Sequence, residues 1–194
     1  MSSASVSAPA AGAESRGVLR LRAAVGAAAL AAGLVALAFA TLPRDHAIVA
    51  AVVSAVLVVL SAIDLEQRII PNKIVLPAAA LVLVLQIGLF PGQVLEWLLG
   101  AVIAAVVFMA PQLFGRSWMG MGDVKLALLL GAALGWGVIG ATLLAFVCVF
   151  PVSLFLLVRK GLAARSTMIP FGPFLSLGAV LTLFGPHLLG LTAS

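Results

Sequence analysis

Charged residues are scarce in this sequence. They make up 9% of the 194 residues, whereas hydrophobic residues make up 64% and the mean hydropathy is +1.29. Soluble domains carry about 25% charged residues. A surface with so few charges cannot keep so much apolar mass in solution, so the composition excludes an ordinary soluble domain. It predicts a chain that contacts membrane lipid along most of its length.

Cysteine and histidine are also rare, with one and two residues, and tyrosine is absent. Cys148 is the single cysteine, so it can form neither an intrachain disulfide nor a cysteine zinc site. The two histidines, His46 and His187, lie far apart in the sequence. We therefore expect no bound metal and no cofactor. The net charge is +5, but the basic residues do not form a stripe interleaved with aromatic residues. We therefore expect no nucleic-acid partner.

Long apolar runs fill the rest of the chain and predict an all-α, polytopic transmembrane helical bundle of about six or seven helices. Residues 1–22 are rich in Ala and Ser with three arginines, which predicts a disordered basic tail before a single transmembrane domain over 23–194. Ala38-Phe39-Ala40 resembles a signal-peptidase site, but it lies within an apolar run of about 20 residues, 23–42, a length that favours a first helix that is retained. The expected spans are 23–42, 46–63, 74–90, 94–114, 124–135, 137–158 and 171–191.

The segment 124–158 is the ambiguous part of this pattern. It is too long for one span and short for two, and Gly135-Trp136-Gly137 offers a break between two helices. With that break and a cytoplasmic N-terminus, ten of the eleven Lys and Arg residues fall on the cytoplasmic side, and only Arg44 falls outside. Because positive residues favour cytoplasmic loops, the pattern predicts a multi-pass protein of the cytoplasmic (inner) membrane.

Two acidic residues share one end of the predicted bundle. Asp64 lies at the cytoplasmic end of the second span, and Asp123 lies at the cytoplasmic start of the fifth. Ionisable groups at membrane depth are costly and are functional candidates by default. The alternative is that both merely cap helix ends, where Asp123 would also complement a helix dipole.

Paired carboxylates in a poorly hydrated site tend to share one proton. One can then take a proton from water while the other protonates a substrate, as in aspartic proteases. The glycines Gly120 and Gly122 lack a β-carbon, so the backbone before Asp123 can adopt positive φ and approach another chain closely. We therefore predict an intramembrane aspartyl peptidase that needs neither a metal nor a serine or cysteine nucleophile.

Three separated motifs resemble those of the type IV prepilin peptidases, which belong to the GxGD aspartyl proteases. The segment GMGDVKL at 120–126 resembles the GxGD signature. The segment DLEQRIIPN at 64–72 is similar to the first-aspartate motif, and IPFGPF at 169–174 resembles the start of the C-terminal helix. Ile63 precedes Asp64 and tyrosine is absent, so the presenilin-like branch, with its Tyr-Asp pair, is disfavoured.

This resemblance implies removal of a short basic leader from type IV or Flp (tight-adherence) prepilin substrates at the cytoplasmic face. With a single cysteine and no paired CxxC motifs, the chain resembles the short, peptidase-only members, and methyltransferase activity is not expected. Asp64 and Asp123 are the expected catalytic pair. The supporting or substrate-binding candidates are Gly120, Gly122, Lys125, Glu66, Pro71, Asn72, Phe171 and Gly172.

Several roles stay open at this point. Lys125 either neutralises the aspartate pair or extends toward the headgroups, and Asn72 hydrogen-bonds either its own loop or the substrate.

A small proton-coupled transporter would also use intramembrane aspartates and helices broken by Gly and Pro. It should show internal symmetry, which is not visible between 23–91 and 94–191. A catalytically inert assembly protein of a pilus system is a third reading.

Overall fold

The computed structural model describes residues 8–113, 120–160 and 170–188, and this part of the chain is α-helical without β-strands. Five of its helices (α1, α2, α3, α4 and α6) are long and apolar enough to cross a membrane, and α7 is a shorter apolar helix. The predicted polytopic helical bundle is therefore confirmed. The elements are α1 (Ala8–Thr41), α2 (Arg44–Gln67), α3 (Asn72–Leu89), the 3-10 turn η1 (Pro91–Gln93), α4 (Val94–Leu113), α5 (Met121–Leu134), α6 (Gly137–Lys160) and α7 (Gly172–Leu188).

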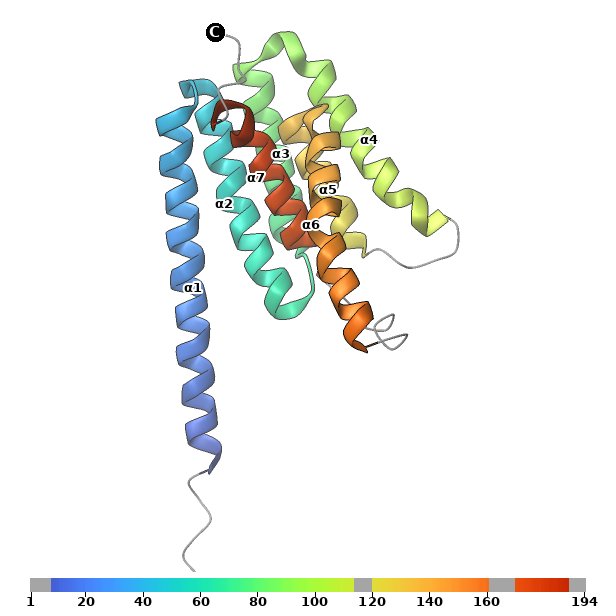
Figure 1. The fold of residues 1–194 in the computed structure, drawn as a ribbon. Helices are drawn as coiled ribbons and strands as arrows, with labels where there is room; N and C mark the ends of the chain where they lie inside the picture. The colour runs from blue at the N-terminus through green and yellow to red at the C-terminus, as the bar shows by residue number, and fades with distance from the viewer. Residues whose placement is uncertain (1–7, 114–119, 161–169, 189–194) are drawn as a thin grey trace, which may run out of the picture.

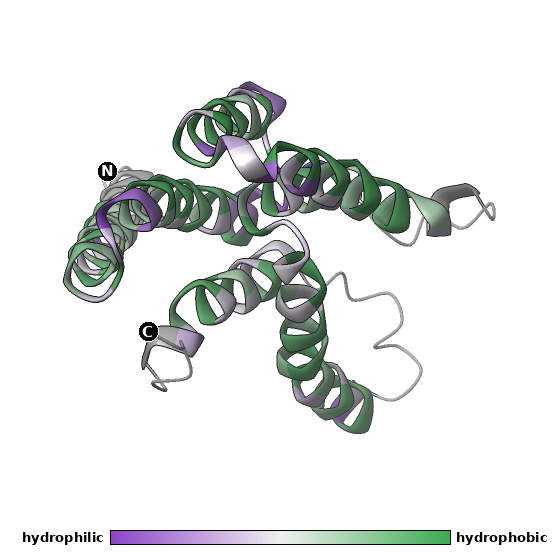
Figure 2. Ribbon diagram, turned by 90° about the horizontal axis from the view of Figure 1, so that it is seen from above, coloured by the Kyte–Doolittle hydropathy of each residue, from purple (hydrophilic) through white to green (hydrophobic). Residues whose placement is uncertain are grey.

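Successive helices run in alternating directions, as Figure 1 shows. The C-terminal ends of α2, α4 and α6 therefore share one end of the bundle with the N-terminal ends of α3, α5 and α7. The view along the bundle in Figure 2 shows mainly hydrophobic ribbon. Large apolar side chains such as Val84, Val106 and Phe150 are exposed on the outside of the helices, which is the pattern expected of a surface in contact with lipid.

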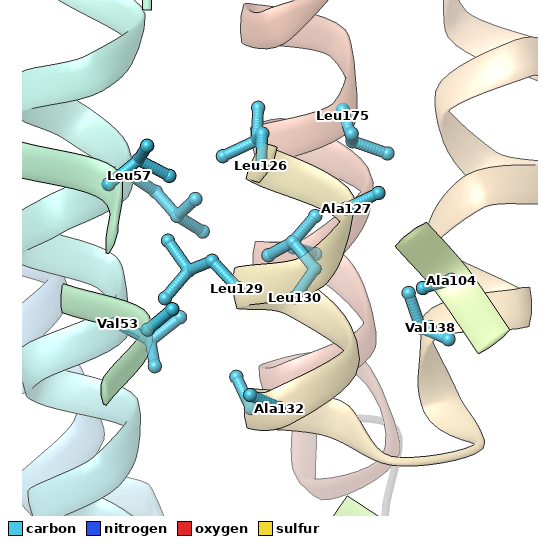
Figure 3. Packing of buried hydrophobic residues seen from close by; sticks show 14 of the residues in the cluster. Val53, Leu57, Ala104, Leu126, Ala127, Leu129, Leu130, Ala132, Val138 and Leu175 are labelled. Atoms are coloured by element: carbon cyan, nitrogen blue, oxygen red, sulfur yellow. The ribbon is translucent and has the colours of Figure 1, made fainter. Parts of the chain in front are cut away.

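The short helix α5 forms the centre of the bundle. It contacts α2, α3, α4, α6 and α7, and its side chains Leu126, Leu129 and Leu130 are fully buried. Figure 3 shows these leucines packed between Leu57 of α2 and Ala104 of α4. A helix that is apolar all round suits a protein core or lipid, and the contacts of α5 with five other helices show that the other helices surround it.

Small residues allow the helices to cross closely. A β-carbon on Gly100 of α4 would lie 2.7 Å from the carbonyl oxygen of Gly131 on α5, and one on Gly178 of α7 would overlap the carbonyl oxygen of Ala141 on α6. In lipid, helix association depends on close van der Waals packing rather than on the hydrophobic effect. These glycines therefore fix the α4–α5 and α6–α7 pairs.

The break in segment 124–158 is present where it was predicted. α5 ends at Leu134 and α6 begins at Gly137, and Gly135 between them has φ of 53°. Its N–H donates to the carbonyl oxygen of Gly131 at 2.9 Å. A side chain is disfavoured at this φ, and a β-carbon there would also lie 2.7 Å from Glu96 Oε1.

Three helix boundaries differ from those expected. α1 begins at Ala8 rather than at 23: residues 8–22 are rich in Ala, Arg and Leu, which favour a helix that continues an existing one. The division into a tail over 1–22 and a domain over 23–194 stays a prediction. α2 continues past Asp64 to Gln67, because Asp64-Leu65-Glu66-Gln67 has no helix breaker. α5 begins at Met121, so Asp123 belongs to its first turn and not to a loop.

The α4–α5 crossing yields a first prediction. Gly131→Ala should lower the free energy of unfolding by about 1–3 kcal/mol, the usual range for overpacking, because the new methyl group would overlap the carbonyl oxygen of Gly100. Unfolding of the detergent-solubilised protein measures the change. Gly33→Ala in α1 is the control, since a β-carbon there meets no atom within 4 Å. Equal stability of the two variants would contradict the close crossing.

Candidate active site

Asp64 occupies the last full turn of α2 and is only 6% exposed. The helix ends at Gln67, because Arg68 adopts a left-handed conformation with φ of 53° and donates its N–H to the carbonyl oxygen of Asp64 at 2.8 Å. This reversal directs the chain into the short connection to α3. Asp64 is thereby held inside the bundle, while Glu66, two residues further along the helix, is exposed on another face.

Gly172 faces the Asp64 carboxylate from the N-terminus of α7. It is buried, and a β-carbon built on it would lie 2.6 Å from Asp64 Oδ2. That oxygen is buried, and the backbone N–H of Gly172 is a donor within reach of the carboxyl group. A buried carboxyl group costs free energy unless it is paired, so Asp64 is a candidate for binding or chemistry. Gly172 lies against Asp64, and its role in the site stays a prediction.

Asp123 lies in the first turn of α5 and is half-buried. Its N–H donates to the carbonyl oxygen of Gly120 at 3.0 Å. Gly120 itself is extended, with φ of −68° and ψ of 143°, and Gly122 is helical. The positive φ considered for these two glycines is therefore wrong, because α5 starts before Gly122 and leaves no tight turn between them.

Close approach is the role that the structure assigns to Gly122. A β-carbon on it would lie 2.9 Å from the β-carbon of Ile70, in the connection that follows Asp64. The chain segments of the two aspartate motifs are thus in direct contact at this point. Sequence reasoning missed Ile70. The one feature of the sequence that could have identified Ile70 is the apolar pair Ile69-Ile70 within an otherwise polar connection.

Lys125 joins the same two segments by a hydrogen bond. Its Nζ donates to Oδ1 of Asn72 at 2.5 Å, across 53 residues of sequence. Neither role considered for Lys125 describes this contact, since the ammonium group is bound to an amide at the start of α3. Pro71 precedes Asn72, and its carbonyl oxygen accepts from the N–H groups of Ile74 and Val75 at 3.0 and 3.1 Å. Pro71 therefore begins α3.

Phe171 lies beside the site in an aromatic cluster. Its ring is 5.5 Å from that of Phe146 on α6 and 6.3 Å from that of Phe108 on α4. These two partners were not identified from the sequence, because their runs are uniformly apolar. Of the IPFGPF motif, Ile169 lies outside the described residues.

In the part of the chain that is described, no group of three His, Cys, Asp or Glu side chains forms a candidate metal site.

These features define a class of protein: a polytopic helical bundle with two aspartates from separate helices near one end. Residues 51–190 match the model of the type IV leader peptidase family. The chain belongs to this family. The match agrees with the motifs around Asp64 and Asp123 and extends over all helices from α2 to α7.

The chain is also similar to curated proteins named prepilin leader peptidase/N-methyltransferase. It is 34% identical to one from Stutzerimonas stutzeri and 32% identical to one from Pseudomonas aeruginosa, each over 139 residues, which cover 68% of this chain and 48% of the relative. For Burkholderia pseudomallei the identity is 32% over 169 residues, covering 80% and 51%. The chain thus spans about half the length of these relatives. No solved structure matches it.

The contact between α5 and the start of α3 yields a second prediction. In a double-mutant cycle, Lys125→Ala and Asn72→Ala should show a coupling of about 0.5–1.5 kcal/mol, the usual contribution of one hydrogen bond. Unfolding of the detergent-solubilised variants measures it. The control is a second cycle that pairs Lys73→Ala with Asn72→Ala: Lys73 also carries a positive charge near Asn72, but the Asn72 hydrogen bond is made by Lys125, so this cycle should show a coupling near zero. A coupling of zero for the Lys125 pair would contradict the contact.

Proposed function

We propose that this protein is an intramembrane aspartyl endopeptidase with Asp64 and Asp123 as its catalytic pair. The observation that carries the proposal is the buried carboxyl group of Asp64, in a chain segment that directly contacts the segment that supplies Asp123. Membership of the type IV leader peptidase family supports the reaction class. The single catalytic domain predicted over 23–194 is part of this proposal.

The mechanism follows from two carboxyl groups that share one proton. The carboxylate takes a proton from a water molecule, whose oxygen attacks the carbonyl carbon of the scissile peptide bond. The carboxylic acid protonates the carbonyl oxygen, and the tetrahedral intermediate then collapses as a proton passes to the leaving nitrogen. The C–N bond breaks, and the pair again holds one proton. No metal or covalent intermediate is involved.

The substrate that we propose is the leader of a prepilin or pseudopilin, since the relatives are named prepilin leader peptidases. Gly120 beside Asp123 is exposed and leaves the backbone accessible on that side of the pair, whereas Gly172 is buried against Asp64. An extended peptide needs such open backbone to approach the carboxylates. Glu66 is exposed near the end of α2 and complements the positive charge of a basic leader.

Isosteric substitution of the two carboxylates tests the proposal. Asp64→Asn and Asp123→Asn should each lower the rate of prepilin cleavage by about 10³-fold or more, because an amide can neither accept nor supply the proton. The measurement is leader removal from a prepilin co-reconstituted in liposomes. Asp45→Asn is the matched control: it lies at the opposite end of α2 and should cleave normally. Full cleavage by either site variant would contradict the pair.

The same proposal places the aspartates at the cytoplasmic face of the cytoplasmic membrane. Arg68, Lys73 and Lys125 lie at the end of the bundle that holds Asp64 and Asp123, whereas Arg44 lies at the other end beside Asp45. Arg159, near the end of α6, also lies at the aspartate end and stacks on Phe155 at 5.0 Å. An excess of Lys and Arg marks the cytoplasmic side.

Reporter fusions test this orientation. Alkaline phosphatase fused after Gly92, in the turn η1, should be active because that turn should face the outside. The same enzyme fused after Arg159, at the aspartate end of α6, should be inactive, and green fluorescent protein at that position should fluoresce. Immunoblots of each fusion control for expression. The reverse pattern would place the aspartates on the outer face.

A further inference from the structure

Three phenylalanine rings from separate parts of the chain meet beside the candidate active site. Phe146 lies on α6, Phe108 lies on α4, and Phe171 lies directly before α7. The ring centroid of Phe171 is 5.5 Å from that of Phe146 and 6.3 Å from that of Phe108, within the range of about 4.5–7 Å that aromatic pairs prefer. Because α4 packs mainly on α5 and α6 packs mainly on α7, the Phe171 ring links two separate helix pairs.

The position of the Phe171 ring is coupled to the backbone of the next residue. Phe171 precedes Gly172, the first residue of α7, and the two lie between Pro170 and Pro173. Proline fixes its own φ near about −65° and also restricts the residue before it. The backbone between the two prolines therefore has little freedom, and a displacement of the Phe171 ring is passed on to Gly172.

Gly172 in turn packs tightly against the carboxyl group of Asp64. A β-carbon on Gly172 would lie 2.6 Å from Oδ2 and 3.3 Å from Cγ of Asp64, and the N–H of Gly172 is a donor within reach of the carboxyl group. Asp64 is only 6% exposed, so its orientation depends on these protein contacts. In enzymes, a displacement of about 1 Å at a positioned group costs about 10²-fold in rate.

The aromatic ring of Phe146 is not needed for contact with lipid. Phe146 is 50% exposed, and the neighbouring Val147 and Phe150 are each 67% exposed. Lipid accommodates leucine as readily as phenylalanine at such a position. Helix association in a membrane depends instead on specific van der Waals contacts. The feature that distinguishes the Phe146 ring is therefore its contact with Phe171.

We propose that Phe146 and Phe108 are positioning residues of the active site, whose rings hold Phe171 and thereby keep Gly172 against Asp64. This inference rests on the proposed peptidase function. The two residues act through Phe171, so the loss of either ring lowers the rate of the chemical step and leaves substrate binding unchanged.

Steady-state kinetics test the proposal, in the same liposome assay with the amount of prepilin varied. Phe146→Leu should lower kcat about threefold to tenfold with KM unchanged, the loss expected for one aromatic pair. Phe146→Tyr keeps the ring and should retain the kcat of the wild type. Phe150→Leu is the matched control on the next turn of α6 and should also cleave at the wild-type rate. Phe146→Leu combined with Phe171→Leu should be no slower than Phe171→Leu alone, because both changes remove the same contact.

Hydrogen exchange measures the same contact without catalysis. The N–H of Leu175 donates to the carbonyl oxygen of Phe171 at 3.0 Å in the first turn of α7. In detergent, the peptide that contains Leu175 should exchange faster in Phe146→Leu than in the wild type or in Phe150→Leu. Unchanged exchange would show that the ring does not hold the start of α7 and would overturn the proposal.

The kinetic outcomes separate this inference from the proposed function. A raised KM with kcat unchanged would mean that Phe146 touches the substrate, and equal kcat for Phe146→Leu and the wild type would mean that its ring is dispensable. Either result would overturn the positioning role. If Asp64→Asn and Asp123→Asn abolish cleavage while Phe146→Leu is fully active, the peptidase assignment stands and the positioning role fails. Full cleavage by the aspartate variants would instead overturn the peptidase assignment itself.

Discussion

The contact between Gly122 and Ile70 is the constraint on which the rest of the site depends. A β-carbon at residue 122 would lie 2.9 Å from that of Ile70, so only glycine lets the start of α5 reach the chain that leaves α2. This contact joins segments that carry Asp64 and Asp123, which are 59 residues apart in the sequence. A larger residue would move the two helices apart together with their carboxylates.

The other end of α5 is held in the same manner, by the crossing of Gly131 with Gly100 on α4. The central helix is therefore positioned at both ends by close approach at a glycine, against the Ile70 side chain at one end and against the backbone of α4 at the other. In lipid, such close packing replaces the hydrophobic effect as the source of helix association. Stability and active-site geometry thus depend on the same few glycines, and a change made to improve one alters the other.

Much of this architecture is predictable from simple patterns in the sequence. Hydropathy indicates which segments contact lipid, glycine indicates breaks and close crossings, and positive charge indicates which loops share one side of the membrane. They located the seven helices and the break at Gly135. They could not reveal that Lys125 bonds Asn72, or that Phe146 and Phe108 meet Phe171, since such contacts depend on helix rotation and crossing. Hydropathy also misplaced the end of α2, because Asp64 and Glu66 are polar residues that a helix tolerates. The roles of the aspartates stay predictions, supported by their surroundings and by the family.

The length of α5 has a consequence for depth. Its 14 residues extend about 21 Å, whereas the hydrocarbon core of a bilayer is about 30 Å thick. If the Gly135 end lay at one membrane surface, the opposite end of α5 would stop short of the other surface, and Asp123 would be recessed below it. The length of α5 therefore sets the depth of the Asp123 carboxylate. Each residue added or removed between Gly131 and Asp123 would shift the carboxylate by about 1.5 Å along the helix axis and rotate it by about 100° around that axis.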